Sequence, residues 1–415
     1  MVKITEGGIV TKYYMADFLL WIYDGLEERV KENMKKLGYL LFAFFFLIGR
    51  IFPVKQKKVV LFNGHNYGLN GNLLEIKRAM EQQQSQQKVP KGSRFTFLFF
   101  SKHDLFSLAG LLGKIRGAVS FFVVLPIQMA TAGRVFLNDN FLPFGYCRPS
   151  KDTQVVQLWH GAGAFKKFGL PVERDEEVKR QVKRANTRIT HLFITSKQVL
   201  PFYQEAFGIK KEHIYVTGIP ITDVYFDEEK KKRGREEFYR QYPQLEGKKL
   251  LLYTPTFRNT EEENISIMEH FDVQKIHQVL GSSWVILVKF HPKYPVSNIT
   301  ENSFCYNMTN YSQMTSLYFV SDLLITDYSS TIVEYVLLDK PIIMYAYDLK
   351  KYDRGFYREY ETTVPGPVAH NEEELLAFLQ DGQKEDQKRQ NFARLQYDDR
   401  DGESAKRILS VLDRE

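Results

Sequence analysis

The stretch Leu323-Leu-Ile-Thr-Asp-Tyr-Ser-Ser-Thr-Ile-Val-Glu334 contains the signals that decide the fold. Its apolar and β-branched beginning predicts a buried strand, and the hydroxyl residues after it predict the N-terminus of a helix. There Ser329, Ser330 and Thr331 lie where helix N-terminal amides favour a phosphate or diphosphate. Plain N-capping by one serine is the alternative interpretation. A strand that leads directly into a helix is the unit of a parallel α/β sheet.

The same alternation recurs along the chain. An apolar run closed by Asn63-Gly64 precedes a helical stretch over residues 73–83. Further strands are predicted at 95–100, 135–138, 155–159, 191–195 and 214–217 and, after the charged stretch 227–247, at 250–253, 285–290 and 341–345. We therefore expect an α/β protein with two Rossmann-like domains, residues 57–226 and 227–415. Such domains bind ligands in a cleft at the carboxyl ends of their strands.

Length and composition agree with two folded domains. The chain has 415 residues, and single hydrophobic cores stop growing at roughly 250–300 residues. Its content of 44% hydrophobic and 26% charged residues is typical of globular proteins. The formal net charge of +7 suits an anionic partner, whether a phosphorylated substrate, an acidic lipid or a nucleic acid, so motifs must decide among them.

The two cysteines, Cys147 and Cys305, lie far apart and form neither a disulfide framework nor a paired zinc-ligand spacing. This usage fits a reducing, cytoplasmic compartment. No cluster of carboxylates marks a Mg²⁺ site in the sequence. We therefore expect no cofactor and no obligatory metal.

Residues 1–56 precede the first predicted domain and contain an apolar run over 37–48, between Lys35-Lys36 and Arg50. The run is short for a membrane span, which needs about 20 apolar residues. It also lacks the position and cleavage site of a signal peptide. A helix lying in the membrane interface, attracted to anionic headgroups by its basic flanks, and a buried core helix remain the two main interpretations.

One candidate catalytic motif is His160-Gly-Ala-Gly-Ala-Phe-Lys-Lys-Phe-Gly169, at the end of the strand predicted over 155–159. An imidazole in this position can act as a general base on a hydroxyl group. Gly161 allows a ligand to approach the backbone, and Lys166 and Lys167 add positive charge beside it. We assign these three residues to the acceptor side of the site. A strand-end histidine with a structural role is the alternative.

Other strand ends carry cations. In Val288-Lys-Phe-His-Pro292, alternation places Lys289 and His291 on one face, where a phosphate could meet both. Arg258, which ends Tyr253-Thr-Pro-Thr-Phe-Arg258, and Arg354 in Asp353-Arg-Gly-Phe-Tyr357 are candidate phosphate clamps, or surface ion pairs. A basic helix is predicted over 176–188, either a solvated face or a second contact for acidic lipid.

Taken together, these motifs resemble one family. Six segments carry the resemblance: Trp159-His-Gly161, Lys166-Lys-Phe-Gly169, Thr217-Gly-Ile-Pro220, Tyr253-Thr-Pro-Thr-Phe-Arg258, Lys289-Phe-His-Pro292 and Thr326-Asp-Tyr-Ser-Ser330. In order and spacing they are similar to the CDP-glycerol glycerophosphotransferases of wall teichoic acid synthesis.

The resemblance implies a glycosyltransferase-B type fold, with the donor nucleotide in the second domain. It implies that His160 and His291 are the functional histidines, and that Asp327, Ser329 and Ser330 contact phosphate. Two positions depart from the family pattern: Glu334 stands where Asp is usual, and Gly218-Ile-Pro-Ile-Thr-Asp223 lacks the usual arginine.

We therefore expect a peripheral transferase at the cytoplasmic face of the membrane. It would move glycerol phosphate from CDP-glycerol to an undecaprenyl-diphosphate-linked disaccharide and release CMP. The short region before Lys57 favours a priming enzyme. A CDP-ribitol-using or polymerising enzyme, or a nucleotide-sugar transferase of the same fold, is the alternative. A nucleic-acid-binding protein would leave the two strand-end histidines unexplained, so we expect no nucleic acid partner.

Overall fold

The computed structural model describes residues 28–64, 67–291, 299, 301–381 and 386–414. Packing divides the chain into two compact units. The first contains the residues up to His160 together with Glu176–Leu192, and the second contains Gly161–Asp175 together with Phe193–Glu415. The assignment of acceptor and donor roles to residues 57–226 and 227–415 stays a prediction.

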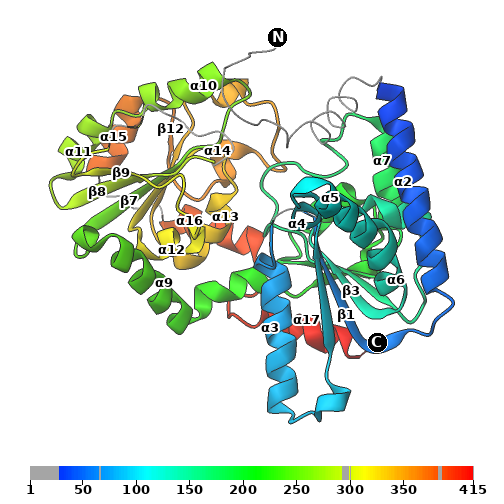
Figure 1. The fold of residues 1–415 in the computed structure, drawn as a ribbon. Helices are drawn as coiled ribbons and strands as arrows, with labels where there is room; N and C mark the ends of the chain where they lie inside the picture. The colour runs from blue at the N-terminus through cyan, green and yellow to red at the C-terminus, as the bar shows by residue number, and fades with distance from the viewer. Residues whose placement is uncertain (1–27, 65–66, 292–298, 300, 382–385, 415) are drawn as a thin grey trace, which may run out of the picture. The chain divides into compact units, whose positions relative to one another are not determined.

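The first sheet has six strands in the order β2-β1-β3-β4-β5-β6 (Figure 1). β1 pairs in parallel with β2 and β3, and β4 pairs in parallel with β3 and β5. The strands are β1 (Lys55–Asn63), β2 (Thr96–Ser101), β3 (Ala132–Leu137), β4 (Gln154–Gln157), β5 (His191–Ile194) and β6 (Ile214–Val216). The accompanying helices are α2 (Glu28–Gly49), α3 (Gly71–Gln86), α4 (Lys102–Phe106), α5 (Gly110–Val119), α6 (Leu125–Ala130), α7 (Glu176–Asn186) and α8 (Leu200–Phe207).

Short helical turns complete this part of the chain. They are η1 (Lys91–Ser93), the π-helical turn η2 (Ser120–Val124), η3 (Leu142–Tyr146), η4 (Lys211–His213) and η5 (Pro220–Phe226). Because η2 lies between α5 and α6, these three elements form one continuous helical stretch.

The second sheet also has six strands, in the order β12-β11-β10-β7-β8-β9 (Figure 1). All its pairings are parallel. The strands are β7 (Lys249–Thr254), β8 (Trp284–Val288), β9 (Cys305–Asn307), β10 (Leu323–Thr326), β11 (Ile342–Tyr345) and β12 (Val368–Ala369). The helices are α9 (Glu228–Gln241), α10 (Glu261–Ser266), α11 (Val273–Leu280), α12 (Met314–Val320), α13 (Thr331–Tyr335), α14 (Tyr360–Thr363), α15 (Glu372–Gln380), α16 (Asp386–Gln396) and α17 (Ser404–Leu412), with turns η6 (Pro243–Leu245), η7 (Ile267–His270), η8 (Val336–Leu338) and η9 (Leu349–Lys351).

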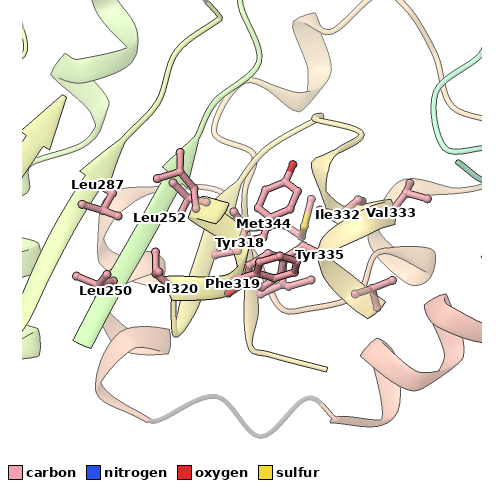
Figure 2. Packing of buried hydrophobic residues seen from close by; sticks show 14 of the residues in the cluster. Leu250, Leu252, Leu287, Tyr318, Phe319, Val320, Ile332, Val333, Tyr335 and Met344 are labelled. Carbon is pink, nitrogen blue, oxygen red and sulfur yellow. The ribbon is translucent and has the colours of Figure 1, made fainter. Parts of the chain in front are cut away.

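Helices cover both faces of the second sheet. On one face Leu250, Leu252 and Leu287 pack with Phe319 and Tyr335 from α12 and α13 (Figure 2). On the other face a second cluster contains residues that alternate with these along the strands, together with residues of α11 and α15: Leu251, Tyr253, Ile286, Val288, Ile276 and Leu375. Burial on both faces explains why these strands are continuous apolar runs. The predicted α/β class with parallel sheets is confirmed.

Every predicted strand exists, with shifts at the ends. The strand predicted over 155–159 stops at Gln157, because Trp159 adopts a positive φ of 57°. The sequence did not predict β9 and β12. Both are edge strands of two or three residues, too short for a periodic pattern.

The apolar run 37–48 belongs to α2, and its two sides meet different environments. Phe42 and Phe46 are buried in the core of the first unit, where the Phe42 ring lies 5.9 Å from that of Phe121. Leu37 and Leu47, by contrast, are 67% and 68% exposed. The helix is therefore both a core element and an exposed apolar surface. The part of the predicted membrane segment over residues 1–27 lies outside the described residues.

A second apolar helix was not singled out in the sequence. Among the described residues, Gly110–Ala130 is the one helical stretch with the length and hydropathy of a membrane span, and 22% of its most apolar window is buried. It packs against α2 so closely that a Cβ on Gly49 would lie 2.7 Å from the Cβ of Ala130.

Candidate active site

His160 follows β4 in the first unit, and the residue before it fixes its position. Trp159 has a positive φ, which is uncommon for a bulky side chain. The Trp159 N–H donates to Oε1 of Gln157 at 2.9 Å, and the Trp159 carbonyl accepts from Nδ2 of Asn72 at 3.0 Å. These two bonds hold the turn that presents His160 at the end of the strand.

The hydrogen bond of the imidazole defines its tautomer. Nδ1 of His160 lies 3.2 Å from the carbonyl oxygen of Asn138. A carbonyl oxygen only accepts, so Nδ1 carries the proton in this contact. In the neutral ring Nε2 then holds the lone pair, and it is the nitrogen that can take a proton from a hydroxyl group.

Buried amide side chains support this arrangement from neighbouring strands. Asn138 donates through Nδ2 to Oδ1 of Asn63 at 2.9 Å and accepts from the Gly64 N–H at 3.1 Å. Gln157 donates to the carbonyl oxygen of Asp139 at 2.9 Å. Asn63 and Gln157 are fully buried. Sequence reasoning missed these amides, because each comes from a different strand and none belongs to a spaced motif.

In the second unit, Asp327 follows β10 and lies in a buried ion cluster. Nη2 of Arg258 lies 3.0 Å from Oδ2 of Asp327, and its Nε lies 2.7 Å from Oδ2 of Asp348. Oδ1 of Asp327 accepts from the backbone N–H of Thr256 at 2.8 Å. Although burial opposes the charge, the two carboxylates raise the pKa of Arg258. Arg258, predicted as a phosphate clamp, is thus engaged by two carboxylates, which favours a role in fixing the Asp327 turn.

Ser329 and Ser330 lie between β10 and α13, a helix of only five residues. Ser329 Oγ is 2.6 Å from Oγ1 of Thr331 and accepts from the Thr331 N–H at 3.3 Å. Ser330 is exposed at the N-cap position and makes no side-chain capping bond. Ser329 therefore stabilises the turn, whereas the Ser330 hydroxyl is accessible to a ligand.

Alternation predicts that Lys289 and His291 share one face, but the structure places their side chains in different environments. The Lys289 ammonium donates to three carbonyl oxygens, those of Met308, Thr309 and Tyr311, at 3.1, 3.1 and 2.7 Å. Burial lowers its pKa to about 8. This arrangement favours a structural role for Lys289. His291 is exposed, and its ring lies 5.6 Å from that of Phe257. Pro292 lies outside the described residues.

The segment Gly161–Asp175 folds with the second unit, although it follows a strand of the first sheet. Lys166 forms an antiparallel bridge with Phe356, and the Lys167 N–H donates to the Gly355 carbonyl oxygen at 3.1 Å. Nε of Arg354 donates to the Lys167 carbonyl oxygen at 3.3 Å. The structure thus brings Lys166, Lys167 and Arg354 together.

The motif that ends at Asp223 anchors the C-terminal helix α17. The two carboxylate oxygens of Asp223 accept from the N–H groups of Ser404 and Ala405, at 3.0 and 2.9 Å. Gly218 has a φ of 79°, and a Cβ there would meet Oγ of Ser404 at 2.2 Å. Both residues therefore have a packing role within the second unit.

Glu334, the other departure from the family pattern, lies in the core. Its carboxyl group accepts from the hydroxyl group of Tyr225. Burial raises the pKa of Glu334, because it disfavours the charged form of the carboxyl group. This position serves packing in this chain.

Cys147 and Cys305 are buried, and burial raises the pKa of their thiols to about 12 and about 11. Within the described ranges, no group of three or more His, Cys, Asp or Glu side chains is placed to hold a metal ion.

Two curated relatives are similar over most of this chain. It is 30% identical over 397 residues to the teichoic acid poly(ribitol-phosphate) polymerase of Bacillus spizizenii, covering 93% of this chain and 61% of the polymerase. It is 29% identical over 375 residues to the teichoic acid ribitol-phosphate primase of the same species, covering 88% of this chain and 93% of the primase. The chain thus spans about three fifths of the first relative's length and most of the second's.

A solved structure shows the same fold. The wall teichoic acid polymerase TagF aligns with a TM-score of 0.67 at 22% identity, over 94% of this chain and 98% of that one.

The profile of one family, CDP-glycerol:poly(glycerophosphate) glycerophosphotransferase, matches residues 44–413. This range includes the strand-end histidines, the Asp327 turn and the lysine segment, so the resemblance inferred from the motifs is confirmed. The chain therefore belongs to the CDP-glycerol:poly(glycerophosphate) glycerophosphotransferase family.

Proposed function

We propose that this chain transfers an alditol phosphate, glycerol phosphate in the first instance, from a CDP-linked donor to a hydroxyl group of a lipid-linked teichoic acid precursor. Membership of the family and the names of the two relatives support this class of reaction. The observation that carries the proposal is the tautomer of His160, whose Nδ1–H is held by the Asn138 carbonyl oxygen. A transferase that uses a hydroxyl nucleophile needs a base of this kind.

In the proposed reaction the acceptor oxygen attacks the β-phosphorus of the donor. The bond from that phosphorus to the bridging oxygen breaks, and CMP leaves with the bridging oxygen. The acceptor proton moves to Nε2 of His160. The new phosphodiester bond joins the alditol phosphate to the acceptor, so atoms and charge balance.

The second unit supplies groups that suit a diphosphate. Ser330 presents an exposed hydroxyl after the Asp327 turn, and His291 is exposed at the end of β8. In the proposal both side chains contact the donor, while Arg258 holds Asp327 in place through their 3.0 Å ion pair. In such a transfer the main catalytic task of the protein is to hold hydrogen-bonding groups where negative charge develops on the phosphate.

The alditol separates two versions of the proposal. The family description names CDP-glycerol, whereas both relatives are named for ribitol phosphate. CDP-ribitol is therefore the second candidate donor. One added unit would indicate a priming enzyme, and a ladder of products a polymerase.

We also propose that the enzyme works as a peripheral protein on an anionic membrane surface, at its cytoplasmic face. Exposed apolar side chains of α2 and α5 support this location, and Leu112 is the most exposed of them at 83%. The basic residues Lys35, Lys36 and Arg116 are exposed on the same two helices. Apolar surface bordered by basic residues is typical of helices that lie in a membrane interface.

A donor screen tests the reaction class. The full chain is incubated with a lipid-linked disaccharide and, in separate reactions, CDP-glycerol, CDP-ribitol and a UDP-sugar, and products are analysed by mass. The expected result is CMP release with one of the two CDP-alditols and a product heavier by the matching alditol phosphate. Transfer from the UDP-sugar, without transfer from either CDP-alditol, would overturn the proposal.

A further inference from the structure

The cation Lys166 has a position that the sequence did not predict. Its segment is fixed to the loop over residues 354–357 by the Lys166–Phe356 bridge and by the bond from the Tyr357 N–H to the Phe165 carbonyl oxygen, 3.0 Å long. The Phe165 ring is buried between those of Phe356 and Phe392, at 5.0 and 6.3 Å. The Lys166 backbone is therefore held firmly within the second unit.

The turn before Lys166 is equally constrained. Gly163 has a φ of 59°, and a Cβ there would lie 2.2 Å from Oε1 of Gln396. That same oxygen accepts from the Ala164 N–H at 2.8 Å. The hydroxyl group of Tyr203 donates to the Gly163 carbonyl oxygen at 2.9 Å. A glycine is therefore required at this turn.

The Lys166 ammonium has no counterion of its own. It lies 5.9 Å from the centroid of the Tyr352 ring, and among the described residues it makes neither a hydrogen bond nor an ion pair. The Tyr352 ring stacks on that of Tyr328, the residue after Asp327, at 4.2 Å, so Lys166 lies beside the Asp327 turn. Asp327 favours the charged form of Lys166, but Arg258 already forms the 3.0 Å ion pair with Asp327. Arg354 is a further cation beside it. A half-buried ammonium without a partner is costly unless an anion binds to it.

Two hydroxyl groups at the Asp327 turn are also available to a ligand. Thr256 donates its backbone N–H to Asp327, yet its Oγ1 is buried without a hydrogen bond in the described structure. Ser330, three residues after Asp327, is exposed without a side-chain capping bond. Hydroxyl donors together with an unpaired ammonium suit the oxygens of an anionic ligand.

We propose that Lys166 binds a phosphate oxygen of the donor's diphosphate beside the Asp327 turn, as a donor-binding rather than an acceptor-side residue. This inference rests on the proposed function. Lys351 differs from it, because its side chain is exposed although it precedes Tyr352, the ring that Lys166 faces. Lys351 therefore provides a control from the same part of the unit.

The ionisation of Lys166 gives the proposal a second readout. Burial, and then the charge of Arg354, lower the pKa of Lys166 to about 8. The protonated amine binds the diphosphate, so donor affinity is full below this pKa and falls as the pH rises through it. Diphosphate binding raises that pKa in the complex, which places the decline in affinity just above pH 8.

Calorimetry on the full chain tests the assignment with CDP-glycerol, CDP and inorganic pyrophosphate as probes, between pH 6.5 and 9.5. We expect Lys166→Met to weaken CDP and pyrophosphate binding about 10–100-fold at pH 7. It should also remove the decline in affinity above pH 8. Lys351→Met should keep CDP and pyrophosphate affinity near wild type, and Lys166→Arg should retain affinity while it loses the alkaline decline.

Unchanged CDP and pyrophosphate affinity in a folded Lys166→Met protein would overturn the assignment. A Lys166→Met protein that keeps its CDP affinity and loses affinity for the acceptor would overturn it as well. Thermal unfolding of each variant shows whether it is folded, and Lys166→Arg provides a second variant with nearly the same volume. Wild-type protein that binds CDP through Lys166 but transfers no alditol phosphate would refute the proposed function and leave this inference standing.

Discussion

Nδ1 of His160 lies 3.2 Å from the carbonyl oxygen of Asn138, and this contact determines which imidazole nitrogen can act as a base. The carbonyl belongs to the residue directly after β3, where the Asn138 side chain is itself bonded to Asn63 of β1. Two strand ends therefore set the orientation of the His160 imidazole.

Replacement of His160 by alanine should lower the rate of chemistry and leave donor binding intact. A general base contributes about 10²–10⁴-fold, so the single-turnover rate of His160→Ala should fall by that order. Donor affinity should stay near wild type, since His160 faces the acceptor hydroxyl in the proposed reaction. Rapid-quench kinetics and calorimetry with CDP-glycerol measure both quantities. A near-normal rate would remove the base assignment.

The sequence predicts the fold more completely than it predicts the candidate site. The strands were predictable because they are apolar runs in sheets covered on both faces, whereas β9 and β12 are edge strands without such a pattern. His160 was recognisable from its place at a strand end beside glycines. The residues that hold His160 in place were not recognisable from the sequence. Asn72, Asn138 and Gln157 lie far apart in the chain and come together only in the folded protein.

For Lys289 the sequence predicts the position of the residue but not the partners of its side chain. Alternation correctly indicates a lysine at a strand end, but it cannot show that the loop over residues 308–311 returns to surround the ammonium with three carbonyl oxygens. That loop is about twenty residues further along the chain. Only the folded structure shows which carbonyl oxygens accept hydrogen bonds from the Lys289 ammonium.

Lys289→Met should destabilise the protein. The variant removes the Lys289 donor from three carbonyl oxygens, of which that of Met308 keeps another donor, the Tyr311 N–H, and the expected loss of unfolding free energy is about 1–3 kcal/mol. Lys351→Met, at an exposed lysine, is the control and should stay close to wild type. Urea unfolding measures stability, and calorimetry measures donor affinity. Unchanged stability with lost donor affinity would instead support the phosphate role that the sequence predicted.

Asp223→Ala should release the N-terminus of α17. The carboxylate accepts from two backbone N–H groups there, and loss of such a cap costs about 0.5–2 kcal/mol. Asp223→Asn keeps an acceptor oxygen and should lose less. Urea unfolding compares the two, and hydrogen exchange of the amides of Ser404 and Ala405 locates the effect. Equal stability of Asp223→Ala and wild type would show that α17 is held by packing alone.

Glu334→Gln should make the protein more stable, by an amount that grows with pH. Burial raises the pKa of Glu334 above its usual value of 4.5, so the folded state keeps a proton that the unfolded chain releases. The contribution of wild-type Glu334 is therefore most favourable below pH 4.5 and declines as the pH rises toward the folded-state pKa. Glutamine cannot ionise and still accepts from Tyr225. Thermal unfolding of both proteins from pH 4.5 to 8 tests this, and a pH-independent difference would contradict it.

Charged substitutions on the exposed apolar faces should release the enzyme from membranes without unfolding it. Leu47 of α2 and Leu112 of α5 are 68% and 83% exposed, so Leu47→Glu and Leu112→Glu leave the core formed by Phe42 and Phe46 intact. Inserting a leucine into the apolar part of an interface contributes about 1.5–3 kcal/mol, so each variant should bind phosphatidylglycerol-containing vesicles roughly 10–100-fold more weakly. Val172→Glu, at an exposed apolar residue of the second unit, is the control and should bind like wild type. Vesicle co-sedimentation measures binding, and equal unfolding temperatures show that the fold is kept.

The lipid charge provides a second test of the same contact. Vesicles without anionic lipid should bind wild type more weakly, because the basic residues Lys35, Lys36 and Arg116 then have no anionic headgroups to attract them. If Leu47→Glu and Leu112→Glu, separately and combined, sediment with vesicles as fully as wild type does, these helix faces are not the membrane contact.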